Sequence, residues 1–489
     1  MLNQNQTPLL DALKANAARP HAPFYTPGHK QGEGISQPLA DLLGTKIFRA
    51  DLTELADLDN LFAPQGVIQE AQQLAAAAFG ASQTWFLVNG STCGVEAAIL
   101  ATCGTGDKII LPRNVHSSAI AGLIISGAIP IFLNPEYDPV LDIAHSITPN
   151  AVQSALQQHP DAKAVLTVYP TYYGVCGDLS AIANITHKYN IPLLVDEAHG
   201  AHFAFHPELP TPALAAGADL TVQSIHKVLG AMTQASMLHV QGNRIDCDRI
   251  SKALQLVQST SPSYLLLASL DAARQQMALH GKMLMSRTLQ LAEEARTRIS
   301  QIPGLSVLEM PRLEGSPGFV ALDKTRLTIT VSGLGLTGFE ADEILDEKLG
   351  VTAEFASLQH LTFIISLGNT PANIEQLVQG FNTLAKKYRR SNLTLKNQVW
   401  QNLDRTLDYA LQLSPREAFF AVSEILPLIQ TNKRICAEIV CPYPPGIPVL
   451  MPGEVITKSV LEYLQQIQAM GGFISGCNDI SLKSLKVVK

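Results

Sequence analysis

The chain has 489 residues and a formal net charge of −7 at pH 7, with 46 % hydrophobic and 16 % charged residues. A chain of this length exceeds a single ordinary core, so we expect roughly two or three domains. The composition is typical of a well-buried protein and excludes a disordered chain. The acidic balance argues against a surface for nucleic acid.

The cysteines and the apolar runs favour a cytoplasmic protein. The chain has seven cysteines, an odd number, and no CxxC pair. A zinc ribbon or a disulfide framework is therefore not expected, no metal site is predicted, and a reducing compartment is favoured. The N-terminus lacks the basic-then-apolar pattern of a secretion signal. The longest apolar run, residues 119–133, is interrupted by Ser126 and Pro130 and is shorter than the ~20 residues of a membrane span.

The first 80 residues are predicted to hold two helices joined by ordered loops. Residues 7–18 place Leu9 and Leu13 at helical spacing behind a Thr-Pro start signal. Residues 24–32 contain a Pro-Gly pair and a further glycine, which is typical of a loop. Residues 69–79 are rich in alanine and predict the second helix.

A strand followed by a glycine-rich turn comes next. Residues 84–88 predict the strand, and Asn-Gly-Ser-Thr-Cys-Gly at 89–94 leads into a helical run at 95–102. Glycines between a strand and a helix let backbone N–H groups converge on an anion at the helix N-terminus. The hydroxyls of Ser91 and Thr92 can add hydrogen bonds, so this turn predicts a phosphate site, although an ordinary helix cap has the same residues.

Further apolar runs predict strands at residues 107–111, 128–133, 164–169, 191–195 and 219–223. Their alternation with helical segments indicates βαβ units and an α/β fold with a mostly parallel central sheet. Such sheets bind ligands at the carboxyl ends of their strands. The polar residues that follow the predicted strands are Ser91, His116, Thr171, Asp196, His199, Ser224 and Lys227.

Asp196 and Lys227 form the central pair of this prediction. Both follow apolar strand-like runs and lie 31 positions apart in the sequence. A lysine amine can form an imine with the aldehyde of pyridoxal 5′-phosphate (PLP). A carboxylate can keep the pyridine nitrogen of that cofactor protonated, so that the ring accepts electrons. The pair therefore predicts a PLP enzyme.

Four neighbours of this pair are candidate cofactor contacts. Ala198 is small enough for the pyridine ring to pack on it. His199 either orients Asp196 or contacts the side of the ring that carries the phenolic oxygen, and the sequence leaves both roles open. Ser224 and His226 flank the lysine and can reach the phosphate.

The second half of the chain predicts a long helical region and a compact α+β unit. Helices are expected at 265–277, 289–302, 338–349 and 374–388, and strands at 326–331, 350–355 and 361–366. Residues 391–412 are polar and predict a linker and a helix. Ser414 and Glu417 form a capping box with proline at the first helical position.

Motifs along most of the chain resemble one family. They are Pro-Gly-His-Lys at 27–30, the Asp196 and Lys227 segments, Tyr-Pro-Pro-Gly-Ile-Pro at 443–448 and Pro-Gly-Glu at 452–454. Together they resemble the bacterial ornithine/lysine/arginine decarboxylases, within the aspartate-aminotransferase group (PLP fold type I). The resemblance spans residues 27–454, is greatest to the arginine decarboxylases, and matches the short form of the family, without an extra N-terminal domain.

The resemblance implies an N-terminal segment at 1–70, a large PLP-binding domain at 71–300, a small α+β domain at 301–390 and a C-terminal decarboxylase domain at 391–489. It further implies PLP as cofactor, an amino acid as substrate, and a homodimer or a larger oligomer built from dimers.

It also assigns roles to single residues. The imidazole of His116 is expected to stack on the pyridine ring. Thr260 and Ser261 are expected to reach the cofactor phosphate of a partner subunit. The candidate acids for the basic end of the substrate are Glu354, Glu438 and Glu454.

The implied reaction is decarboxylation of a basic amino acid, arginine before lysine or ornithine, to a polyamine-type amine and CO₂. Either Lys227 or His116 returns a proton to Cα. Phe62, Gln65 and Ser357 depart from the residues typical of the family. The alternatives are another fold type I enzyme, an aminotransferase or aldolase, and a catalytically silent PLP-binding regulatory homologue.

Overall fold

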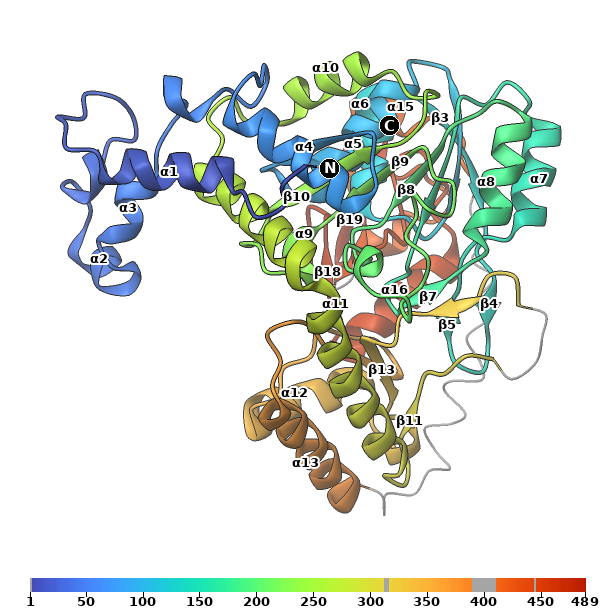
Figure 1. The fold of residues 1–489 in the computed structure, drawn as a ribbon. Coiled ribbons are helices and arrows are strands. Elements are labelled where there is room, and N and C mark those ends of the chain that lie inside the picture. Colours follow the sequence, from blue (N-terminus) through green and yellow to red (C-terminus); the bar gives the residue numbers. More distant parts are fainter. Residues whose placement is uncertain (1, 312–315, 389–409, 444–445) are drawn as a thin grey trace. The chain divides into compact units, whose positions relative to one another are not determined.

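The structure is a computed structural model (Figure 1). It describes residues 2–311, 316–388, 410–443 and 446–489. Residues 391–409 of the expected linker and helix, and Pro444 and Pro445 of the C-terminal motif, lie outside the described residues.

The chain forms two compact units, each built from two stretches of sequence. Unit 1 comprises residues 1–102 and 192–286, and unit 2 comprises residues 103–191 and 287–489. Each unit contains both strands and helices.

Unit 1 begins with a helical arm. Its elements are α1 (Pro8–Ala18), η1 (Lys30–Gly32), α2 (Gln37–Leu43), α3 (Lys46–Ala50), η2 (Ala56–Leu58) and α4 (Val67–Phe79). The two helices predicted in this region are confirmed as α1 and α4. Proline occupies the first turn of α1, and Gly80 ends α4 in the left-handed conformation that glycine adopts without strain.

The sheet strands of unit 1 lie in the order β1 (Gln83–Leu87), β10 (Ser236–Val240), β9 (Leu220–Gln223) and β8 (Leu193–Asp196). β8 and β9 are parallel, whereas β10 is antiparallel to both β9 and β1. Every residue of β8, β9 and β10 is buried, which explains why these strands have continuous apolar sequences instead of alternating ones.

Helices complete unit 1. They are α5 (Gly90–Thr102), α9 (Ile225–Val228), α10 (Cys247–Val257) and the first part of α11 (Tyr264–Ser300), with η3 at Phe203–Phe205. Helix α5 packs closely on the strands through Gly94, where a Cβ atom would lie 2.6 Å from Val222 and 2.7 Å from Leu87. The glycine therefore sets how near the N-terminus of α5 approaches the ends of β1 and β9.

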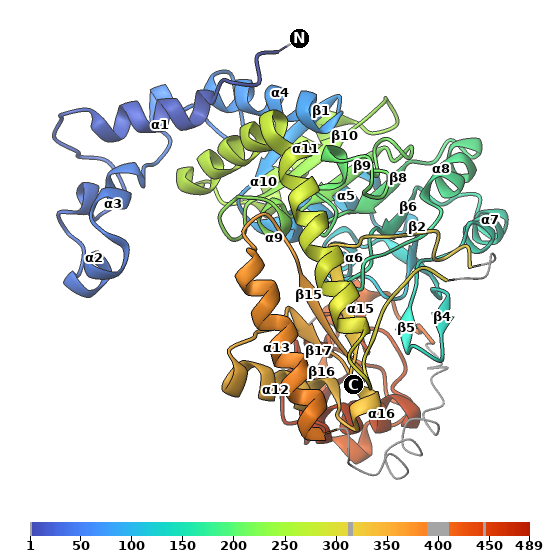
Figure 2. The ribbon, with the colours of Figure 1, turned by 60° about the horizontal axis from the view of Figure 1, so that its bottom comes forward.

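Helix α11 is one continuous helix of 37 residues (Figure 2). The helices predicted at 265–277 and 289–302 are confirmed as helical up to Ser300, but both stretches belong to this one helix. The residues between them, 278–288, include a single glycine, Gly281. An isolated glycine costs a helix only about 1 kcal/mol relative to alanine. The helix also packs closely on Phe205 at this point, since a Cβ atom at Gly281 would lie 3.0 Å from that side chain.

Unit 2 contains three parallel strands, with β2 (Lys108–Pro112) between β3 (Ile129–Leu133) and β6 (Ala164–Val168). The accompanying helices are α6 (Ser117–Ser126), α7 (Pro149–Gln158) and α8 (Leu179–Lys188). Short strand pairs are formed by β4 (Tyr137–Asp138) with β5 (Ile143–Ala144), and by β7 (Val175–Cys176) with β12 (Ala321–Leu322).

A second sheet of unit 2 forms the predicted α+β unit. Its strand order is β11 (Ser306–Val307), β13 (Arg326–Thr330), β15 (His360–Ile364) and β14 (Phe355–Ala356), accompanied by η4 (Ser332–Leu334), α12 (Gly338–Leu349) and α13 (Pro371–Tyr388). One hydrophobic cluster joins these helices to the sheet, and Figure 2 shows α13 beside β15. The strand predicted at 350–355 is wrong for most of its length, because Gly350 ends α12 in the left-handed conformation.

The C-terminal segment of unit 2 has its own hydrophobic cluster. Its elements are α15 (Pro415–Phe420), β16 (Ser423–Pro427), η5 (Leu428–Gln430), β17 (Cys441–Tyr443), α16 (Lys458–Ala469), β18 (Phe473–Ser475) and β19 (Ser484–Val488). The predicted capping box is confirmed, since Glu417 N–H donates to Ser414 Oγ at 3.2 Å and Ser414 N–H donates to Glu417 Oε2 at 2.9 Å.

The predicted α/β class with mostly parallel central strands is confirmed. Parallel pairing joins β8 to β9 and β2 to both β3 and β6. Among the described residues, no helix combines the length and the apolar character that crossing a membrane requires.

Candidate active site

The carboxyl ends of β8 and β9 bring the two central residues of unit 1 together. Asp196 is the last residue of β8 and pairs in register with Val222 of β9. Two residues beyond Val222, Ser224 begins the short helix α9, which carries Lys227. Because the two strands are parallel neighbours, both functional groups lie at the same edge of the sheet, as the sequence predicted.

The lysine has a specific partner at this edge. Lys227 Nζ lies 2.9 Å from His199 Nε2, and Asp196 Oδ1 accepts a hydrogen bond from Ala198 N–H at 3.2 Å. The sequence left His199 with two possible roles, on Asp196 or on the cofactor. In the structure it contacts the lysine amine.

The predicted phosphate site is assembled from two separate segments. Helix α5 begins at Gly90, so Ser91 and Thr92 lie in its first turn and not in a preceding loop. The Ser224 hydroxyl, which is fully buried, donates to Ser91 Oγ at 2.8 Å. The N-terminus of a helix with adjacent hydroxyls favours an anion, because its first N–H groups have no partner within the helix.

His226 lies beside the lysine on α9 and remains neutral at pH 7. Burial of the ring, followed by the charge of Lys227, lowers the pKa of His226 to about 4. A neutral imidazole next to the lysine adds no positive charge that would oppose protonation of the amine.

A buried carboxylate next to Asp196 supports both strand ends, and the sequence analysis missed it. Glu197 is fully buried. One oxygen accepts from Ala213 N–H at 2.8 Å, and the other accepts from Thr221 Oγ1 at 2.9 Å and Gln223 Nε2 at 2.8 Å. Burial raises the pKa of Glu197 to about 7. A charged residue directly after an apolar strand was the available signal.

His116 belongs to unit 2 and follows β2, as expected. It is the N-cap residue of α6, and its Nδ1 accepts a hydrogen bond from Ser118 N–H at 3.2 Å and lies 2.9 Å from Ser118 Oγ. Because a backbone amide can only donate, Nδ1 is the acceptor and the neutral ring carries its proton at Nε2.

Two of the three acids predicted to meet a substrate are held inside unit 2. Glu454 receives two hydrogen bonds from Arg113, at 3.0 and 2.9 Å. The oxygens of Glu438 accept backbone N–H groups from Asn478 and Lys486, each at 2.7 Å. These contacts do not support the expectation that Glu438 and Glu454 face a substrate.

Three further candidate contacts, one for the substrate and two for the phosphate of a partner subunit, are exposed. Glu354 lies at the surface of unit 2, and Thr260 and Ser261 lie at the surface of unit 1. Arg113, which the sequence analysis also missed, is nearly buried. Its position two residues after the predicted strand at 107–111, and three residues before His116, is the signal that could have identified it.

A lysine and a carboxylate at the ends of neighbouring parallel strands, beside a hydroxyl-lined helix N-terminus, define an α/β enzyme. The model of the Orn/Lys/Arg decarboxylase major domain matches residues 7–373, and that of the Orn/Lys/Arg decarboxylase C-terminal domain matches residues 398–478. The chain therefore belongs to the Orn/Lys/Arg decarboxylase family of amino acid decarboxylases.

Individual relatives agree with this assignment. An arginine decarboxylase of Bacillus subtilis (strain 168) is 40 % identical over 488 residues, which cover 100 % of this chain and 99 % of the relative. An arginine decarboxylase of Bacillus anthracis is 39 % identical, covering 100 % and 98 %. The solved structure of lysine decarboxylase A from Pseudomonas aeruginosa superposes with a TM-score of 0.84 at 25 % identity, covering 99 % of this chain and 80 % of that one.

Proposed function

We propose that the protein is a PLP-dependent decarboxylase of a basic amino acid, with arginine preferred over lysine and ornithine. The observation that carries this proposal is that Asp196 ends β8 and that Lys227 lies on α9, directly after the neighbouring parallel strand β9. The chain also belongs to the Orn/Lys/Arg decarboxylase family. The products are CO₂ and the corresponding polyamine-type amine.

The residues of unit 1 fit the cofactor. The first turn of α5, with Ser91 and Thr92, and the buried Ser224 hydroxyl supply donors for its phosphate. Asp196 supplies the negative charge that holds a proton on the pyridine nitrogen. When bound, the cofactor supplies an electron-withdrawing ring that stabilises negative charge developing at Cα.

The other residues supply binding and proton transfer. Lys227 would hold the cofactor through its aldehyde, and His199, 2.9 Å from the lysine amine, could receive or return a proton there. We propose that His116 packs against the ring and that Ala198 lines its other side. His226 supports the phosphate site as a neutral donor. Glu354, which is exposed, remains the candidate for the basic end of the substrate.

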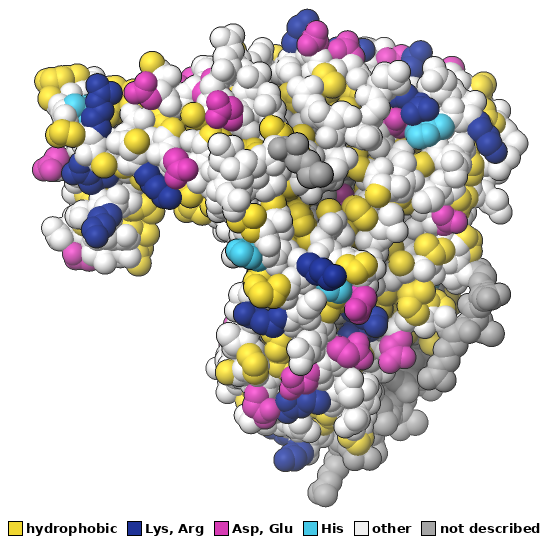
Figure 3. Space-filling view, viewed as in Figure 1, with side chains coloured by type: hydrophobic (Ala, Val, Ile, Leu, Met, Phe, Trp, Pro, Cys, Tyr) yellow, Lys and Arg dark blue, Asp and Glu magenta, His cyan; other side chains and the backbone are white. Residues whose placement is uncertain are grey.

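We further propose that the protein acts as a homodimer in the cytoplasm. Phe24 is 94 % exposed and Leu42 of the arm is 78 % exposed, and hydrophobic side chains are visible on the arm surface (Figure 3). A second copy would cover them, and Thr260 and Ser261 would then be available to the partner's phosphate site. All seven cysteines are thiols, which suits a reducing compartment.

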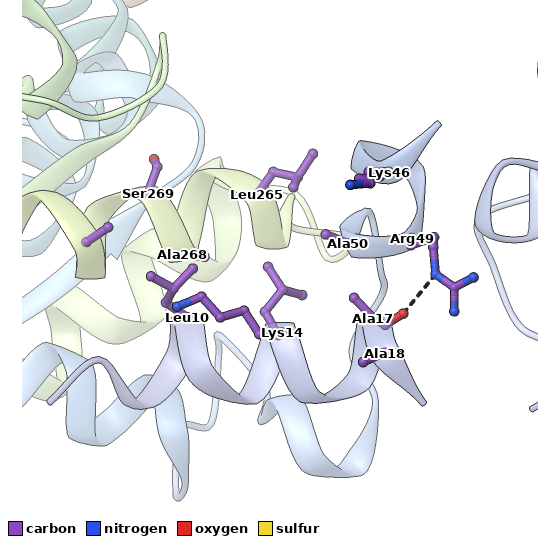
Figure 4. A pocket seen from close by; sticks show the side chains of 12 residues that line it. Leu10, Lys14, Ala17, Ala18, Lys46, Arg49, Ala50, Leu265, Ala268 and Ser269 are labelled. Atoms are coloured by element: carbon purple, nitrogen blue, oxygen red, sulfur yellow. Dashed lines mark hydrogen bonds between the residues drawn. The ribbon is translucent and has the colours of Figure 1, made fainter. Parts of the chain in front are cut away.

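A cavity lies on the same helical arm. It has a volume of about 480 Å³ and lies between α1, α3 and the start of α11 (Figure 4). Apolar side chains of Leu10, Leu13 and Leu265 line it, and Arg49 Nε donates to Ala17 O at 3.0 Å at its edge.

Light scattering should give the mass of two chains for the wild type, and Leu42→Glu should shift the mass toward one chain. A wild-type mass of one chain would contradict the dimer.

The reaction is tested by measuring CO₂ release from carboxyl-labelled arginine, lysine and ornithine in parallel, with PLP added. We expect the highest kcat/KM for arginine. Cofactor binding without CO₂ release from any of the three would favour the catalytically silent homologue. With a 2-oxo acid supplied as amino acceptor, formation of a keto acid from the amino acid in place of CO₂ would favour an aminotransferase.

A further inference from the structure

The loop that carries His116 is held by the C-terminal segment of the same unit. Arg113 follows β2, three residues before the histidine. Its Nη1 donates to Pro448 O at 2.7 Å, and its Nη2 donates to Val449 O at 3.2 Å. Both acceptors belong to the end of the Tyr-Pro-Pro-Gly-Ile-Pro motif or follow it directly. Backbone carbonyls at the end of this motif thus accept hydrogen bonds from Arg113, the first residue of the loop that carries His116.

Glu454 accepts the other hydrogen bonds of the same guanidinium. Arg113 Nε donates to Glu454 Oε1 at 3.0 Å and Nη2 donates to Glu454 Oε2 at 2.9 Å. The side chains of this pair are 6 % and 2 % exposed. Two parallel hydrogen bonds between planar groups fix orientation as well as distance.

The glycine of the Pro-Gly-Glu motif is required for this placement. Gly453 has φ of +97°, and a Cβ atom there would lie 2.1 Å from Leu413 O. Gly453 N–H also donates to Cys436 O at 2.9 Å. No other residue fits this backbone, so the motif places the Glu454 carboxylate opposite Arg113.

A further contact lies on the other side of the histidine. Ser117 N–H donates to Gly446 O at 3.2 Å, and His116 Nδ1 is held by Ser118 N–H at 3.2 Å. Residues 113–118 are therefore bound by the C-terminal segment on both sides of His116, while the local turn fixes the ring.

We propose that Arg113 and Glu454 are positioning residues that hold the His116 imidazole in its place for catalysis. The role of the Pro-Gly-Glu motif is then to place Glu454 opposite Arg113. The proposal rests on the role proposed above for His116. The pair acts through the backbone of the loop and touches neither substrate nor cofactor. It gives Glu454 a role inside the fold in place of the substrate contact that its charge suggested.

The far end of α6 offers a matched control. Arg416, also from the C-terminal segment, donates through Nη1 to Ile124 O at 3.0 Å and to Ile125 O at 2.7 Å. Arg416 thus joins the C-terminal segment to α6 at the end remote in sequence from His116. Both arginines link the C-terminal segment to the stretch from β2 to α6 through backbone carbonyls, but Arg113 donates to carbonyls of the C-terminal segment and lies three residues before the histidine.

The test compares Arg113→Met, Arg113→Lys, Glu454→Gln and the double variant Arg113→Met/Glu454→Gln with Arg416→Met in the full PLP-loaded chain. Since a misplacement of about 1 Å can cost about 10²-fold in rate, we expect kcat to fall by about that factor for Arg113→Met. Arg113→Lys keeps the charge but not the fork and should recover little. The double variant leaves no unpaired buried charge, so it reports positioning even if Arg113→Met folds poorly.

Three readouts separate positioning from stability: kcat against KM, the melting temperature, and the visible absorbance of the cofactor. We expect the Arg113 variants to lose kcat with the visible band retained, and Arg416→Met to lower the melting temperature while kcat stays near the wild-type value. Equal losses of kcat in Arg113→Met and Arg416→Met would overturn the proposal, as would a double variant with wild-type kcat.

His116→Ala distinguishes this proposal from the proposed function. If the wild type releases CO₂ and His116→Ala is slow while the Arg113 variants remain fast, only the positioning role fails. If the wild type shows neither CO₂ release nor a visible cofactor band, the proposed function itself fails.

Discussion

Two regions contain similar charged side chains in different structural positions. One is the site at the strand ends of unit 1, and the other is the C-terminal segment of unit 2. Asp196 is the last residue of β8, and Lys227 lies on α9 directly after the parallel neighbour β9. Glu438 and Glu454 lie among loops and bind backbone N–H groups and an arginine of the same unit. Charge alone therefore does not separate the side chains proposed for chemistry from those held inside the fold.

The largest expected effect comes from the lysine. Lys227→Ala removes the only group proposed to bind the cofactor aldehyde, so we expect activity and the visible absorbance of the imine to be lost together. The exposed Lys252 on α10 provides the control, and Lys252→Ala should retain both. Absorbance titration with PLP and the CO₂ assay measure the outcome. Activity surviving in Lys227→Ala would end the assignment.

The aspartate comes second. Asp196→Asn keeps an oxygen for Ala198 N–H but loses the charge opposite the pyridine nitrogen. We expect kcat to fall by about 10² or more, the order found when one preorganised group that stabilises developing charge is removed. Asp246→Asn makes the same change at the N-cap of α10, where asparagine caps equally well, and should be silent.

The third effect is a pH dependence of stability from Glu197. Burial raises its pKa in the folded protein from 4.5 to about 7. Because the folded protein holds this proton more tightly than the unfolded chain, protonated Glu197 contributes to the free energy of unfolding. This contribution is complete below pH 4.5 and is lost as the pH rises through 7. Between these limits the loss is up to about 3 kcal/mol.

Urea unfolding midpoints at pH 5 and pH 8 check this expectation. The wild type should lose stability relative to Glu197→Gln over this interval, because glutamine has no proton to lose. A constant difference between the two proteins would show that Glu197 is already ionised at pH 5.

The smallest effect is expected at the phosphate site. Ser224→Ala removes the hydroxyl that bonds Ser91. One hydrogen bond contributes about 0.5–1.5 kcal/mol, so PLP affinity should weaken by about tenfold or less. Ser82→Ala, at the opposite end of β1, should leave the affinity unchanged. Equilibrium dialysis of PLP would show whether the two serines differ.

Much of unit 1 could be predicted from sequence because strand runs, glycines and the lysine have local signals. The ends of β8 and β9 were located closely, and the sequence alone assigned both Ser91 and Ser224, which are 133 residues apart, to the phosphate. Roles that depend on a distant partner were missed. The role proposed for Arg113 depends on Glu454, which is 341 residues away, and on the carbonyls of Pro448 and Val449.

The structure also explains two local differences from the predicted elements. Helix α11 continues through Gly281 because tertiary packing against Phe205 outweighs a weak helix preference. The strand expected at 350–355 ignored the left-handed Gly350, although glycine after a helical run is a recognised stop signal. The proposed roles of the site residues and the predicted domain ranges remain predictions.

The central claim is that Lys227 carries the cofactor, and trapping that bond tests it most directly. Borohydride reduction of the PLP-loaded protein followed by peptide mass spectrometry should place the pyridoxyl label on Lys227, the residue beside His199. A label on any other lysine, or none on a protein that releases CO₂, would contradict the account.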